Sequence, residues 1–141
     1  MAVTVTIIAG LCTASSAIAT NTGLQTLGNS VNSIDVFTFT CPAGSGPRAR
    51  VNDSITPSPA GVSMQAVLGQ SSVPTVQVTD TSDDGLPSAW TSIIPVAGSH
   101  VVAFKKTGAA TESYNGEVQC CTISAVCGNT AGNLLTRQIN Q

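Results

Sequence analysis

The sequence predicts an all-β protein, an antiparallel β-sandwich of the jelly-roll or immunoglobulin-like kind with about seven to nine short strands. Three observations lead to this prediction. Runs of five to nine residues alternate apolar and polar side chains, which is the period of a half-buried strand. Clusters of Gly, Pro, Asn, Asp and Ser separate the runs, with no amphipathic helical period between them. Five cysteines in a chain of 141 residues predict stabilisation by disulfides.

The N-terminal residues 1–19 resemble an export signal. An apolar run, Ala2–Leu11, is followed by the small residues Ala17–Ala19, the pattern of a cleavage site. We therefore expect a secreted protein, extracellular or at the cell surface, whose mature chain begins at Thr20. The basic residue that usually opens such a signal is missing, so the alternative is that Val3–Ile7 is a strand of the folded protein. The apolar run is shorter than the about 20 residues that cross a bilayer, and no membrane span is predicted.

The mature chain divides into an arm, a sandwich and a tail. Residues 20–33 are polar and are expected to form an N-terminal arm or an edge strand. Residues 34–122 hold the sandwich domain, and residues 123–141 form a C-terminal tail or a last strand. Seven strands are expected in the sandwich: Ile34–Thr40, Pro47–Asn52, Val62–Leu68, Val73–Asp80, Trp90–Ile94, His100–Lys106 and Tyr114–Thr122.

Alternation within these strands predicts a core between two sheets. A domain of about 120 residues buries enough apolar surface to fold alone. Each disulfide would add roughly 2–4 kcal/mol to its stability. The predicted core residues are Phe37, Phe39, Met64, Leu68, Val76, Val78, Trp90, Val102, Phe104 and Val118.

The cysteines predict two disulfides. Removal of residues 1–19 takes away Cys12 and leaves four cysteines, which are Cys41, Cys120, Cys121 and Cys127. Four cysteines in an oxidising compartment allow three connectivities. Because Cys120 and Cys121 are adjacent in a strand, they point to opposite faces and take different partners. We favour Cys41 with Cys120 and Cys121 with Cys127. A metal site is the alternative, but the spacing is poor for zinc.

The order of short motifs from Ile34 to Gln119 resembles that of a known family. The motifs are an opening D-x-F-x-F strand at Asp35–Phe39, a turn and strand at Gly44–Asp53, and two late strands at Gly98–Phe104 and Tyr114–Val118. In these features the chain resembles bacterial pre-peptidase C-terminal-like β-sandwich domains over about two-thirds of its length. The resemblance implies a sandwich fold and the accessory role of such modules beside secreted enzymes. It implies no catalytic residue.

Low charge excludes several function classes. Five basic and seven acidic residues, 12 in all, give a net charge of −2, whereas about a quarter of an ordinary globular protein is charged. Without a basic cluster, nucleic acid is not an expected partner. The chain has one histidine, His100, and no G-x-S-x-G motif, in which the nucleophilic serine of many hydrolases lies. We therefore predict no enzyme, and we expect His100 at the rim of the sandwich. Lys105 and Lys106 are expected to protect a strand edge from unwanted pairing.

Two local features favour an alternative function, a secreted module that binds a glycan or calcium. Asp80, Asp83 and Asp84 lie in a short acidic turn that could supply oxygen ligands to calcium, although Asp/Gly loops also form ordinary turns. No other cofactor is expected. Trp90 and Tyr114 could form an aromatic platform for a sugar, although a lone Trp in a small sandwich is more often buried in the core.

The main prediction is a non-catalytic extracellular structural protein, a self-associating surface, matrix or fibre subunit. In this chain, 18 Thr and 16 Ser replace charges as solvating groups, so little charge repulsion separates neighbouring copies. Residues 20–33 and 123–141 could each extend the sheet of a neighbour. Such strand addition would produce a homo-oligomer or a polymer.

Overall fold

Six of the seven predicted runs, together with both terminal segments, form nine strands in the part of the chain that the structure describes. This computed structural model describes residues 19–59, 61–82, 84–129 and 135–140. The predicted export signal therefore lies outside the described residues except for its last position. The strands are β1 (Thr20–Leu27), β2 (Ile34–Cys41), β3 (Ser45–Asp53), β4 (Met64–Gln70), β5 (Val73–Asp80), β6 (Gly98–Lys106), β7 (Glu112–Thr122), β8 (Cys127–Asn129) and β9 (Leu135–Asn140).

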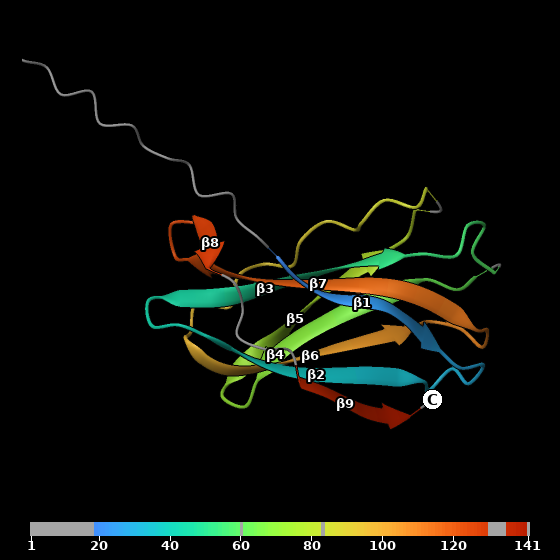
Figure 1. The fold of residues 1–141 in the computed structure, drawn as a ribbon, viewed down its shortest axis with the longest axis horizontal. Coiled ribbons are helices and arrows are strands. Elements are labelled where there is room, and N and C mark those ends of the chain that lie inside the picture. The colour runs from blue at the N-terminus through green and yellow to red at the C-terminus, as the bar shows by residue number, and fades with distance from the viewer. Residues whose placement is uncertain (1–18, 60, 83, 130–134, 141) are drawn as a thin grey trace, which may run out of the picture.

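These strands form two antiparallel sheets that face each other as a sandwich (Figure 1). Sheet A has the order β1-β7-β3, and β8 pairs with the end of β7. Sheet B has the order β5-β4-β6-β2-β9. The described residues contain no helix, and the predicted all-β, disulfide-stabilised sandwich is confirmed.

Both terminal segments pair within their own chain. β1 pairs with β7 from Thr20 opposite Val118 to Leu27 opposite Glu112. β9 pairs with β2 and forms the edge of sheet B. A bulge interrupts β1 next to Gly23, which has a φ of 71° and so adopts a conformation that glycine tolerates best.

Inward-facing side chains of both sheets form one core. Seven predicted core residues are buried, and Val76 and Val78 on the edge strand β5 are partly buried against them. The ring of Phe104 lies 5.7 Å from that of Phe37 and 5.1 Å from that of Tyr114, measured between centroids. A Cβ atom at Gly116 would approach the Phe104 ring to 2.3 Å, so only glycine lets this ring pack against the opposite sheet.

The free edge of β3 is covered by an extended segment, residues 88–94. The Ser88 N–H donates to the Val51 carbonyl at 2.8 Å, and the Val51 N–H donates back to the Ser88 hydroxyl at 3.1 Å. Thr91 repeats this exchange with Ala49 at 2.8 and 3.0 Å. Backbone donors on this edge are therefore satisfied by side-chain hydroxyls.

The prediction of a regular strand at Trp90–Ile94 is wrong. Side-chain hydroxyls, in place of the backbone carbonyls of a normal ladder, accept the N–H groups of β3. The bonded residues Ser88 and Thr91 are three positions apart, whereas their partners Val51 and Ala49 are two apart. On the same edge, a carboxylate oxygen of Asp80 accepts the N–H of Asp53 at 2.9 Å, and Pro47 has no N–H to offer. The edge thus presents few free donors to an added strand.

Candidate functional site

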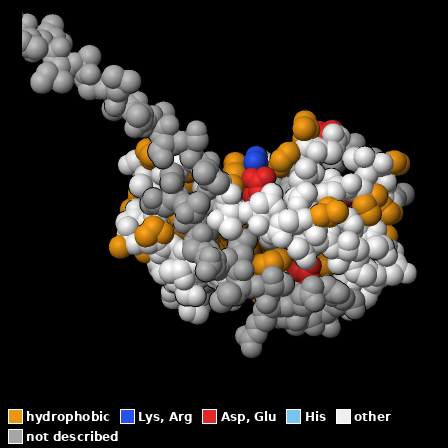
Figure 2. All heavy atoms as spheres, in the orientation of Figure 1, with side chains coloured by type: hydrophobic (Ala, Val, Ile, Leu, Met, Phe, Trp, Pro, Cys, Tyr) orange, Lys and Arg blue, Asp and Glu red, His pale blue; other side chains and the backbone are white. Residues whose placement is uncertain are grey.

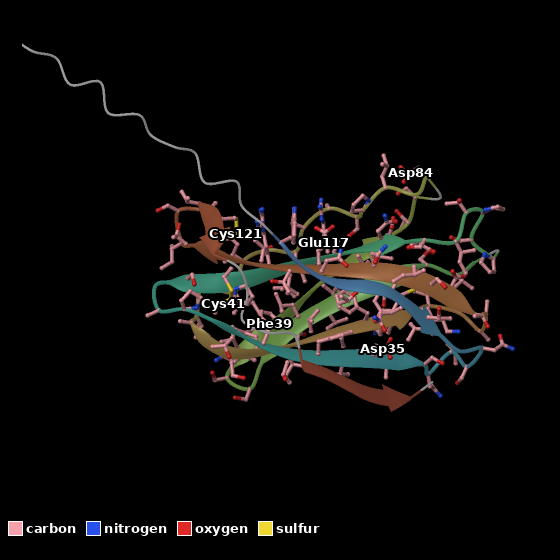
Figure 3. All side chains as sticks on the ribbon, viewed as in Figure 1. Asp35, Phe39, Cys41, Asp84, Glu117 and Cys121 are labelled. Carbon is pink, nitrogen blue, oxygen red and sulfur yellow. A yellow bond between two sulfur atoms is a disulfide. The ribbon has the colours of Figure 1, made fainter. Side chains whose placement is uncertain are left out.

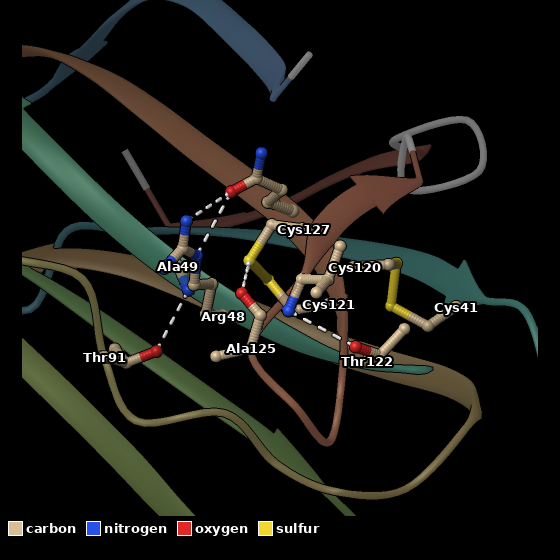
Figure 4. Close-up of a disulfide and its surroundings, with 11 residues drawn as sticks. Cys41, Arg48, Ala49, Thr91, Cys120, Cys121, Thr122, Ala125 and Cys127 are labelled. Carbon is tan, nitrogen blue, oxygen red and sulfur yellow. Dashed lines mark hydrogen bonds between the residues drawn. A yellow bond between two sulfur atoms is a disulfide. The ribbon is translucent and has the colours of Figure 1, made fainter. Parts of the chain in front are cut away.

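Two disulfides lie side by side at the end of β7 (Figure 4). Cys41–Cys120 connects β2 in sheet B with β7 in sheet A, and both cysteines are buried in the core. Cys121–Cys127 connects β7 with β8. Both predicted pairings are confirmed. Adjacent residues in a strand point to opposite faces, so Cys120 and Cys121 bond to different partners, as expected.

The second disulfide closes the turn between β7 and β8, which we call the disulfide-closed turn (residues 122–126). Thr122 and Val126 are joined by a backbone hydrogen bond of 2.9 Å, and the Ala125 N–H donates to the Thr122 carbonyl at 2.9 Å. The side chains of Ile123 and Val126 are 76% and 67% exposed. Since the turn has no charged residue, it is a constrained, uncharged, apolar projection at one end of the sandwich (Figure 1).

A shallow apolar groove of about 390 Å³ lies on the outer face of sheet B. Val67, Val101 and Ala103 face outward there because Leu68, Val102 and Phe104 face the core. We call this feature the sheet B groove. It is lined by Val67, Gly69, Gln70, Ser71, Thr75, Val101 and Ala103, none of which is charged.

Trp90 is not a core residue, so this prediction is wrong. It is half-buried beside β3, and the guanidinium carbons of Arg48 and Arg50 lie 4.4 and 4.5 Å from its ring centroid. Arg50 also forms an ion pair with Glu117 at 2.7 Å. Because the segment around Trp90 follows the edge of β3, its side chain meets the outward-facing arginines of that strand.

Tyr114 lies in the core, fully buried, and its hydroxyl donates to a carboxylate oxygen of Asp35 at 2.9 Å. Burial, together with the Asp35 charge and this hydrogen bond, raises the pKa of Tyr114 well above its usual range. Trp90 and Tyr114 are on opposite faces of sheet A, so they do not form the predicted aromatic platform. Tyr114 is inaccessible to any sugar.

The acidic turn has a different geometry at each of its aspartates. Asp80 is buried, whereas Asp84 is exposed and accepts the Leu86 N–H at 2.8 Å. The Ser82 hydroxyl lies 3.0 Å from Asp80 and 3.1 Å from Asp84. Asp83 lies outside the described residues. Within the described ranges, no three His, Cys, Asp or Glu side chains gather as metal ligands, and calcium binding stays a prediction.

His100 is fully buried in the core, which corrects its predicted place at the rim. Its ring centroid lies 5.7 Å from that of Phe39, its partner on β2. Burial lowers the pKa of the His100 imidazole, and the backbone of Val96 raises it in part. Alternate residues of a strand face the same side, so His100 faces the core together with Val102 on β6. The position of His100 in the strand, and not its polarity, therefore determines its burial.

The expectation that Lys105 and Lys106 protect a strand edge is wrong, because β6 is paired on both sides, with β4 and with β2. The two lysines lie on opposite faces of sheet B. Lys105 is half-buried on the outer face, whereas Lys106 is 3% exposed. The Lys106 ammonium donates to the backbone carbonyls of Gly28 and Ala110. Burial lowers the pKa of Lys106, and the Glu112 charge raises it in part. We call Asp35, Lys106, Glu112 and Tyr114 the polar cluster.

Comparisons with known proteins add no relative. A scan against protein-family models and searches of curated proteins and of solved structures each returned no match for this chain. The resemblance to pre-peptidase C-terminal-like domains therefore stays a prediction. In the ranges that the structure describes, no helix is long and apolar enough to cross a membrane.

Proposed function

We propose that this protein is a non-catalytic extracellular structural subunit that associates with copies of itself. The observation that carries the proposal is the sheet B groove, an apolar patch on the outer face of sheet B whose lining carries no charge. Exposed apolar surfaces of this kind mark protein contacts. Two copies that meet on uncharged surfaces bury no unpaired charge, which would otherwise oppose their association.

The distribution of charge supports self-association more strongly than the composition does. Of the ten charged residues whose burial the structure describes, five are buried, namely Asp35, Asp53, Asp80, Lys106 and Glu112. Arg50 and Glu117 neutralise each other on the outer face of sheet A. The face drawn in Figure 2 accordingly shows few charged side chains, a basic one that adjoins an acidic one near the middle and isolated acidic ones elsewhere.

The disulfides support the extracellular part of the proposal. Bonds such as Cys41–Cys120 and Cys121–Cys127 persist in oxidising compartments and are rare in the reducing cytosol. The non-catalytic part is supported by the burial of His100, because a base in the core does not reach a substrate in solution.

The test is the oligomeric state of the oxidised protein. Intact mass first establishes the N-terminus and the number of disulfides. Sedimentation velocity and light scattering are then measured up to about 1 mM protein, where contacts as weak as roughly −4 kcal/mol are detected. We expect the mean mass to rise with concentration. A protein that remains monomeric over the whole range would contradict the proposal.

A further inference from the structure

We propose that copies of this protein join head to tail, with the disulfide-closed turn of one copy seated in the sheet B groove of the next. This inference rests on the proposed self-association and specifies its contact. Two features of the same chain carry it. One is an apolar projection and the other is an apolar groove, and both are open to solvent and carry no charge.

The projection is well suited to docking because it is ordered before it binds. Ile123 and Val126 project from a turn whose ends are joined by the Cys121–Cys127 disulfide and by a backbone hydrogen bond. Ala125 adopts a φ of 60° within this turn, which places the chain reversal between the two apolar side chains. A constrained loop loses little conformational freedom on binding, so more of the contact energy becomes affinity.

The groove offers the complementary chemistry. Val101, 42% exposed, lies opposite Gly69 and supplies apolar surface together with the neighbouring pair Val67 and Ala103, while Gln70 and Ser71 supply polar groups. The backbone groups of an incoming turn can hydrogen-bond to such polar residues. Neither surface brings a charge into the contact, so docking incurs none of the desolvation cost of an unpaired ion.

The positions of the two surfaces predict the kind of assembly. The disulfide-closed turn extends from sheet A, beside β8 (Figure 1). The sheet B groove lies on the outer face of the opposite layer. Because the two patches differ, a copy that has docked its turn still offers its groove to another copy. Such a heterologous contact forms a ring where its rotation closes and a filament where it does not.

The test uses one variant of each surface and a matched control. The turn variant is Ile123→Asp with Val126→Asp, and the groove variant is Val101→Asp. We expect each to raise the dissociation constant for self-association about tenfold or more. Leu86→Asp is the control, since Leu86 is 62% exposed but lies outside both surfaces, and it should associate like the wild type.

Fold and contact are separated by two further measurements. Melting curves show whether Val101→Asp remains folded, and Val101→Thr, which preserves a β-branched side chain, is the milder groove variant. A Cys121→Ser, Cys127→Ser double variant frees the turn but leaves Cys41–Cys120 in place. We expect it to associate more weakly than the wild type while it remains folded.

Mixing the variants provides the decisive result. Each alone is expected to remain monomeric at concentrations where the wild type associates, but the groove variant retains an intact turn and the turn variant an intact groove. Their mixture should therefore form a one-to-one dimer that does not grow further. A groove-to-groove contact would instead leave the turn variant as associated as the wild type, which would overturn this inference but not the proposed function. A monomeric wild type would overturn both.

Discussion

The two ends of the core are stabilised by different means, as the positions of Cys41 and Asp35 at opposite ends of β2 illustrate (Figure 3). At one end, the Cys41–Cys120 disulfide joins the sheets, and Phe39 and His100 pack on the neighbouring inward positions. At the other end, the polar cluster is buried without any covalent link between the sheets. The covalent end is sensitive to reduction, whereas the polar end depends on hydrogen bonds that must offset the cost of burying charge.

The largest effect is expected from removal of the disulfide at the covalent end. Cys41→Ala with Cys120→Ala frees a loop with a sequence separation of 79, and loop-closure entropy predicts a loss of about 4 kcal/mol. Urea unfolding at neutral pH measures it. The matched control is Cys121→Ser with Cys127→Ser, which opens a separation of 6 and should cost only about 2 kcal/mol. Equal losses would contradict this interpretation.

At the polar end, Lys106→Met should cost about 3 kcal/mol. The substitution removes the donor to the Gly28 and Ala110 carbonyls and leaves the buried Glu112 charge without its neighbouring cation. Lys105→Met is the control, because Lys105 faces outward and should change the free energy of unfolding by less than about 0.5 kcal/mol. Similar values for the two variants would show that the polar cluster contributes little.

Tyr114→Phe should cost about 1–2 kcal/mol, because it leaves the buried Asp35 carboxylate without its hydroxyl donor. It should also change the response to base. The pKa of Tyr114 is raised by folding, so its contribution is complete below pH about 10 and is lost as the unfolded chain ionises above that pH. The difference in stability between wild type and Tyr114→Phe should shrink above pH 10, and a constant difference would contradict this.

The smallest effect on stability is expected from His100, and it should appear at mildly acidic pH instead of in base. Burial lowers its pKa, so the unfolded state binds a proton below pH about 6.5 while the folded state does not. Stability should fall as pH falls from 6.5 toward the folded pKa, by at most about 1.4 kcal/mol per pH unit. His100→Leu removes the only histidine and should abolish this slope between pH 7 and 6. A slope that persists in the variant would exclude His100 as its origin.

The apolar part of this fold was predictable from the sequence. The expected strand Val73–Asp80 matches β5, and Ile34–Thr40 falls one residue short of β2. Alternation identified these strands because apolar side chains recur at every second position and Gly or Pro separates them. The cysteine pairing followed from the opposite directions of Cys120 and Cys121.

The polar cluster and the two surfaces of the proposed contact were not predictable in the same way. Polarity suggested that His100 and Lys106 lie outside, although their alternation with Val102 and Phe104 places all four inward. Trp90 was misplaced because a segment hydrogen-bonded through hydroxyls has no regular period to detect. The sheet B groove combines residues of several strands, and only their register brings Val67 next to Ala103.

The Cys41–Cys120 bond also determines how the chain responds to tension. If the chain is pulled from its two ends, the force passes directly from Cys41 to Cys120 and bypasses the residues between them. At about 3.4 Å per extended residue, the separation of 79 withholds about 270 Å of chain from stretching. Pulled in this way, the oxidised chain would lengthen only through the segments before Cys41 and after Cys127. Reduction would release the bypassed length and make the chain far more extensible.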